Sequence, residues 1–78
     1  MSRYLDIAFA TLKQEPDNYK VIARGMAVKN AELLVSKLKY SFPHYNFDLN
    51  YLKAFNKGGE VVTEFHAMLT KKRFQTAL

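Results

Sequence analysis

The sequence predicts a small α+β domain with two layers, in which one helix packs on one face of an antiparallel sheet in the order β-β-α-β-β. Residues 27–42 repeat apolar side chains every three or four positions, which is typical of a helix with one buried face. Residues 45–55 and 60–69 alternate apolar and polar side chains, which is typical of strands with one buried face. A length of 78 residues with 49% hydrophobic residues favours a single folded domain, residues 1–78, and excludes a second.

The helix is the clearest element. Its apolar stripe consists of Val28, Ala31, Leu34, Val35, Leu38 and Phe42. Phe42 precedes Pro43, and a residue before proline avoids the helical region of backbone space, so the helix should end near Ser41. The stripe is expected to cover the apolar face of the sheet.

Residues 45–55 and 60–69 are expected to form a hairpin, because Asn56-Lys57-Gly58-Gly59 between them is rich in turn residues. A three-residue loop, residues 57–59, puts all the apolar side chains on one face, whereas an even loop would set apolar residues beside polar ones. The pairs predicted are Phe55–Val61, Tyr51–Phe65, Leu49–Ala67 and Phe47–Leu69. These eight residues, apart from Ala67, are the predicted sheet side of the core. Gly59 should adopt the left-handed conformation that such loops require.

The first 26 residues are ambiguous. Residues 4–9 alternate like a strand, yet Leu5, Ala8, Phe9 and Leu12 also fit one face of a helix. Residues 14–18 contain Pro16 and read as a turn, and residues 19–26 read as a strand. A first hairpin is favoured over a helix followed by a strand, and the helix stays open as the alternative.

Composition bounds the class of protein. The chain has no cysteine, which excludes disulfides, thiolate nucleophiles and cysteine-based metal sites. Its N-terminal region lacks the apolar stretch of a signal peptide, and no run approaches the ~20 apolar residues of a membrane span. We therefore expect a cytoplasmic protein that does not enter a membrane.

Neither a catalytic site nor a cofactor site is predicted. His44 and His66 do not have the spacing of metal ligands. Asp48, Glu60 and Glu64 are expected on the outer, solvent-facing side of the second hairpin, where no cleft would exclude water and shift their pKa values. The expectation is a protein that is not an enzyme and that holds no cofactor or metal.

The outer face of the sheet is the predicted binding surface. It should carry Leu52, Val62, Glu64, His66 and Met68, a mixture of apolar and polar side chains that is common where proteins meet. The favoured function is a small protein-binding domain, a modulator or inhibitor of the kind that phages and mobile elements direct at a host protein or nucleoprotein complex. The same face would also permit a homodimer.

Nucleic-acid binding is the alternative. The net charge of +5 favours a polyanionic partner, and the one basic run is Lys71, Lys72 and Arg73. These three residues are the candidate phosphate contacts. They open the segment 71–78, which is expected to be a tail beyond the last strand.

Overall fold

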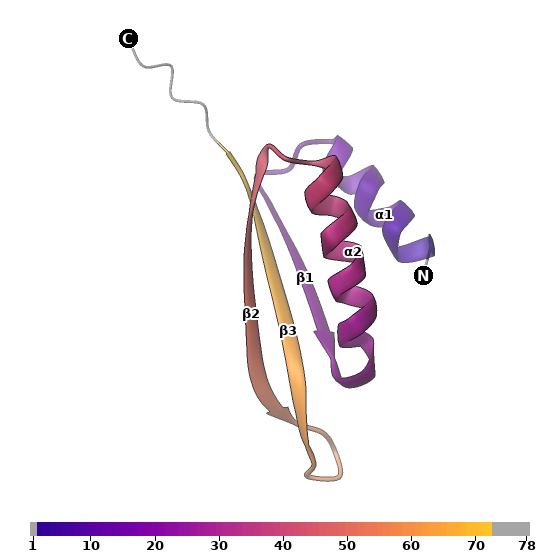
Figure 1. The fold of residues 1–78 in the computed structure, drawn as a ribbon, viewed down its shortest axis with the longest axis vertical. Coiled ribbons are helices and arrows are strands. Elements are labelled where there is room, and N and C mark those ends of the chain that lie inside the picture. Colours follow the sequence, from indigo (N-terminus) through magenta and orange to yellow (C-terminus); the bar gives the residue numbers. More distant parts are fainter. Residues whose placement is uncertain (1, 73–78) are drawn as a thin grey trace.

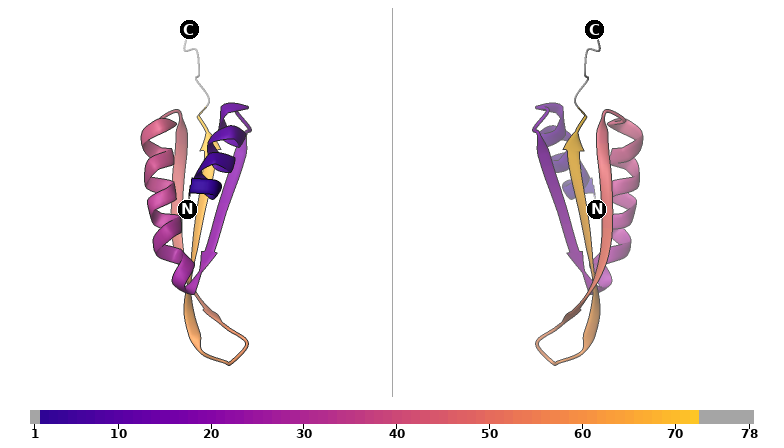
Figure 2. Two further views of the ribbon diagram at one scale, coloured as in Figure 1. Left: turned by 90° about the vertical axis from the view of Figure 1, so that its right-hand side faces the viewer. Right: turned by 90° about the vertical axis from the view of Figure 1, so that its left-hand side faces the viewer.

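The computed structural model of the chain describes residues 2–72, which form two helices and three strands (Figure 1). The elements are α1 (Ser2–Lys13), β1 (Asn18–Arg24), the short 3₁₀ helix η1 (Gly25–Ala27), α2 (Val28–Ser41), β2 (Tyr45–Phe55) and β3 (Val61–Lys71). The strands make one antiparallel sheet in the order β1-β3-β2. Both helices lie on the same side of this sheet, so the other side is an open face (Figure 2). The predicted α+β class is confirmed.

The second hairpin has the predicted register. Phe55 pairs with Val61 and Tyr51 with Phe65, and the remaining predicted pairs also form. The Asn56 N–H donates to the Glu60 carbonyl at 3.0 Å, which closes a loop of three residues. Gly59, the last of them, has a φ of +81°, in the region that a residue with a side chain adopts only under strain. The alternation of apolar side chains was therefore sufficient to define the pairing.

Helix α2 also matches its prediction. Its buried residues are Ala31, Leu34, Val35 and Leu38. The helix ends at Ser41, and the N–H of Phe42 donates to the Leu38 carbonyl at 2.7 Å. Phe42 itself is buried and completes the stripe that faces the sheet.

The predicted first strand is wrong, because residues 2–13 form helix α1. The order is therefore α-β-α-β-β, with three strands and two helices in place of four strands and one helix. Ala8 and Leu12, four residues apart, are both completely buried, whereas Ile7, which a strand would have turned to the core, is 55% exposed. Helical spacing buries the two residues that pack best against α2 and the sheet, and this tertiary packing decides between the two patterns.

Four of the seven residues of the predicted sheet core are exposed, and helix and strand lengths explain the exposure at the far end of the hairpin. Phe65 and Leu69 are completely buried, but Phe55 is 69% exposed and Val61 59% exposed. Helix α2 has 14 residues and spans about 21 Å, whereas the 11 residues of β2 or β3 span about 36 Å. The end of the hairpin, residues 52–64, therefore extends past the helix as a hairpin tip (Figure 1).

Strand β3 also runs further than predicted. It ends at Lys71 and not at Leu69, so the expected tail at 71–78 begins inside the sheet. The Lys71 N–H donates to the Asp17 carbonyl at 2.9 Å, and the Lys72 N–H donates to the His44 carbonyl at 2.9 Å. Backbone hydrogen bonds on both sides thus hold this end of β3, and residues 73–78 lie outside the described part of the chain.

Truncating Phe65 or Phe55, two of the phenylalanines of the hairpin, should show how differently the core and the tip contribute to stability. Phe65→Ala should lower the free energy of unfolding by about 3–5 kcal/mol, because it empties a fully buried site. Phe55→Ala should cost about 1 kcal/mol or less, because most of the ring already contacts solvent. Urea unfolding of both variants checks this difference, and equal losses would show that the tip is covered in solution.

Candidate functional site

The open face of the sheet gathers all five residues that the sequence assigned to partner binding. Leu52 lies on β2, and Val62, Glu64, His66 and Met68 occupy alternate positions along β3. The register places three cross-strand rows on this face: Arg24–Glu64–Leu52, Ile22–His66–Asn50 and Lys20–Met68–Asp48. The five predicted residues therefore share one surface, centred on the middle strand.

An ion-paired cluster occupies the centre of the open face. Arg24 donates to Glu64 Oε2 from Nε at 2.9 Å and from Nη2 at 2.5 Å. His66 Nε2 donates to the other carboxylate oxygen of Glu64 at 2.6 Å. The Glu64 side chain is only 15% exposed, and residues on β1 and β3 bind both of its carboxylate oxygens.

The cluster keeps Glu64 ionised. The hydrogen bond from His66, followed by that from Arg24, holds the pKa of the Glu64 carboxyl below its ordinary value. A carboxylate in this state accepts hydrogen bonds and does not donate a proton near neutral pH. Its arrangement suits a fixed polar contact at the middle of a surface better than acid–base chemistry.

Apolar side chains surround this polar centre. Leu52 is 50% exposed beside Glu64, and Ile22 is 54% exposed beside His66. Val62 and Met68 are half-buried on β3, on either side of Glu64 and His66. Sequence analysis missed Arg24 and Ile22, because only the pairing of β1 with β3 brings them to this face.

The three carboxylates considered for catalysis do not form one cluster. Asp48 lies opposite Met68 on the open face, whereas Glu60 directly follows the hairpin loop and accepts a hydrogen bond from the Asn56 side chain at 3.3 Å. Within residues 2–72, no three His, Asp or Glu side chains are close enough together to hold a metal ion. Over the same residues, no helix is both long enough and apolar enough to cross a membrane.

Two of the three predicted phosphate contacts border a cavity at the opposite end of the sheet from the hairpin tip. Lys71 and Lys72 line a space of about 460 Å³ together with Lys13, the last residue of α1, and His44. Glu15 is the carboxylate in this lining, and its Oε1 lies 3.3 Å from Lys71 Nζ. We call this lining the basic cavity. Arg73, the third predicted contact, lies outside the described residues.

The sequence offered no signal for Lys13 or His44 as members of this cavity. Lys13 is 58 residues from Lys71 along the chain, and helix α1 was expected to be a strand. The loop between α2 and β2 carries His44 to the same end, where its carbonyl accepts the hydrogen bond from Lys72. Only the three-dimensional arrangement converts a short basic run into a concave basic surface.

The Glu64 cluster should make the free energy of unfolding depend on pH in the acid range. Because its folded pKa is lowered, Glu64 contributes stability above its unfolded pKa, and this contribution is lost as the pH falls through the folded value. Glu64→Gln should be less stable than the wild type at pH 7, and the two should converge as the pH falls below the ordinary pKa of a glutamate, about 4.3.

Urea midpoints between pH 7 and pH 3 measure this convergence. Asp48→Asn removes a carboxylate from the same face, but one without a hydrogen bond or ion pair to the described residues. This control should keep the wild-type slope. A constant gap between wild type and Glu64→Gln at every pH would contradict the assignment of the cluster.

Comparison with known proteins does not add a family to these observations: no family model matches the chain, and no curated protein is similar enough to count as a relative.

Proposed function

We propose that this chain is a small, non-enzymatic binding protein that docks on another protein through the open face of its sheet. The observation that carries the proposal is the composition of that face, an ion-paired centre with exposed apolar side chains around it. Protein interfaces commonly combine apolar contacts with a small number of well-placed polar groups. The function is that of a modulator of the kind that phages and mobile elements direct at host proteins.

The rigidity of the open face supports this proposal. Its residues stand on paired strands, and the side chains of Arg24, Glu64 and His66 hold one another in place. A surface that is already ordered loses less conformational entropy on binding than a flexible one. The free energy gained by burying Leu52 and Ile22 would therefore be offset less by the entropy lost in ordering side chains than on a flexible surface.

The hairpin tip exposes apolar side chains on both of its sides. Phe55 and Val61 are exposed on its helix side, and Leu52 is exposed on its open-face side. A monomer rarely leaves apolar side chains of this size together in solvent without a partner. The chemistry expected of the partner is an apolar cleft that receives the tip, bordered by a flatter surface against the open face.

Replacing one apolar residue on the open face should weaken partner capture. Leu52→Lys places a positive charge opposite the Glu64 carboxylate, so the free protein should tolerate it. Docking against an apolar partner surface would remove water from that charge, which costs free energy. Leu33→Lys is the matched control, since Leu33 is 55% exposed on the solvent side of α2.

Tagged wild type and both variants are compared by capture of proteins from cells that express them. The expected result is a specific partner whose yield falls at least tenfold with Leu52→Lys and stays at the wild-type level with Leu33→Lys. Equal yields for the two variants would contradict docking through the open face.

Nucleic-acid binding is the second candidate, favoured by the basic cavity. Lys13, Lys71 and Lys72 surround one concave surface with a single carboxylate among them. Lysines that converge in this way can contact neighbouring phosphates of a nucleic-acid backbone. The proposal for this alternative is sequence-independent binding to phosphates at the end of the sheet away from the tip.

Salt dependence tests the alternative directly. Each phosphate contact to duplex DNA contributes about 0.9 to the slope of log affinity against log salt, so replacing Lys13, Lys71 and Lys72 with alanine should lower the slope by up to about 2.7. The control replaces Lys29, Lys37 and Lys39 on α2 and changes the net charge equally. Equal slopes in the two variants, or no binding of duplex DNA at low salt, would exclude the basic cavity as a nucleic-acid site.

A further inference from the structure

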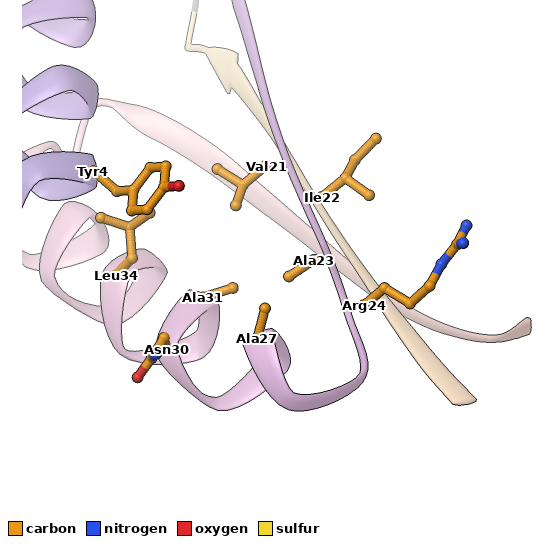
Figure 3. Close-up of a pocket in the computed structure, with 9 residues that line it drawn as sticks. All are labelled: Tyr4, Val21, Ile22, Ala23, Arg24, Ala27, Asn30, Ala31 and Leu34. Carbon is orange, nitrogen blue, oxygen red and sulfur yellow. The ribbon is translucent and has the colours of Figure 1, made fainter. Parts of the chain in front are cut away.

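A second surface lies on the helix side of the sheet, where a groove of about 410 Å³ opens between α1, β1, η1 and α2 (Figure 3). We call it the edge groove. Its apolar lining consists of Tyr4, Val21, Ala23, Ala27, Ala31 and Leu34. The Tyr4 side chain points from α1 toward β1 across the groove (Figure 3). The groove lies on the opposite side of the sheet from the open face.

Strand β1 forms one wall of the groove, and one side of β1 has no neighbouring strand in the sheet of the described residues. In an antiparallel pair, residues that exchange hydrogen bonds alternate with residues that do not. The Lys71 N–H donates to the Asp17 carbonyl, so Asp17 belongs to the bonded set. Counting in twos along β1, Val21 and Ala23 direct their backbone groups to β3, whereas Ile22 and Arg24 direct theirs away from the sheet.

Ile22 and Arg24 line the edge groove although their side chains do not enter it. The Ile22 side chain lies on the open face beside His66, and Arg24 reaches Glu64 on that same face. Figure 3 shows both side chains pointing away from the groove. What these two residues offer to the groove is therefore their backbone N–H and C=O groups.

These two features together are those of a strand-addition site. An extended peptide that pairs with an exposed sheet edge gains backbone hydrogen bonds, and pockets beside the edge accept its alternate side chains. Peptide residues opposite Val21 and Ala23 would turn their side chains into the edge groove. Those opposite Ile22 and Arg24 would turn theirs to the open-face side.

The charges on β1 favour an acidic peptide. Between Asn18 and Arg24, β1 carries two basic residues, Lys20 and Arg24, and no acidic one. Both basic side chains lie on the open-face side. Lys20 has no ion pair to the described residues, so a carboxylate opposite it would be favourable. Arg24 binds Glu64 through Nε and Nη2, which leaves its Nη1 group for a further carboxylate. A second copy of this chain fits poorly, because antiparallel pairing of two β1 edges centred on Ile22 would set Lys20 against Arg24 twice.

We propose that β1 and the edge groove bind an extended acidic peptide by strand addition, with apolar side chains entering the groove and carboxylates on the opposite face near Lys20 and Arg24. The recognised pattern is an alternation of apolar and acidic residues. Its partner would be a protein that presents such a segment in an extended, unpaired form.

Three labelled octapeptides test the pattern by fluorescence anisotropy: one alternates valine and glutamate, one alternates valine and lysine, and one carries four valines followed by four glutamates. The alternating acidic peptide should bind at least tenfold more tightly than either of the others. Equal affinity of the two acidic peptides would reduce the interaction to charge alone and overturn the proposal. No binding of the alternating acidic peptide would also overturn it.

Two variants of Ile22 test the role of the backbone. Ile22→Pro removes an N–H that points away from the sheet, so the pairing of β1 with β3 should survive, as it does where natural edge strands carry proline. Ile22→Thr keeps the N–H and also shortens the apolar side chain. The proline variant should bind the alternating acidic peptide at least tenfold more weakly than the threonine variant, and equal binding would overturn the proposal.

A third variant fills the groove without touching the edge. Ala27 is exposed and lines the groove, so Ala27→Phe should occupy the space while the fold is retained. Ala27→Phe should weaken peptide binding at least tenfold, and unchanged binding would overturn the proposal. This test stands even if Ile22→Pro proves too unstable to assay. Leu52→Lys on the open face should leave peptide binding unaltered, which separates this site from the surface of the proposed function.

Discussion

The central position of β3 is the constraint on which the rest of the structure depends. Its odd-numbered residues bond to β1 and turn their side chains to the helices, where Phe65, Ala67 and Leu69 are completely buried. Its even-numbered residues bond to β2 and turn their side chains to the open face, where Glu64 and His66 form the polar cluster. One strand thus supplies the floor of the core and the middle of the candidate interface. A register slip of one residue would exchange the two sets and destroy both.

Length limits how much of the sheet such a small chain can cover. Two helices of 12 and 14 residues cannot span strands of 11 residues, because a helix advances less than half as far per residue as a strand does. Tyr51 marks the limit of the covered part, since its hydroxyl donates to the Glu32 carboxylate near the start of α2. Beyond that contact the apolar pattern of the hairpin continues, but no helix of the described chain packs on it. The apolar residues of the tip are therefore available for contacts other than the protein's own core.

Sequence reasoning succeeded where the information was local. The stripe of α2, the hairpin register and the conformation of Gly59 each follow from residues close together in the chain, and all three predictions are confirmed. It failed at residues 2–13, where the strand and helix patterns overlap and packing of Ala8 and Leu12 decides. Of the candidate sites, the membership of the open face on β2 and β3 was predictable. Arg24 was not, because its contact with Glu64 joins residues 40 positions apart across strands whose order the sequence does not state.

The two edges of the sheet differ in which residues point their backbone N–H and C=O groups away from the sheet. Along β2 the outward backbone groups belong to residues such as Leu49 and Lys53, whose side chains lie on the helix side. That edge carries Lys53 on one face and Asp48 on the other, so it favours neither sign of charge, and an exposed lysine discourages edge-to-edge association. Along β1 the outward groups belong to residues whose side chains lie on the open face. The helix side of that edge carries Val21 and Ala23, which line the apolar edge groove. Outward-pointing backbone groups, the apolar edge groove and two basic residues without an acidic one therefore occur together along β1 and not along β2. Which residues point their backbone groups outward thus distinguishes an edge that can select a partner strand from one that cannot.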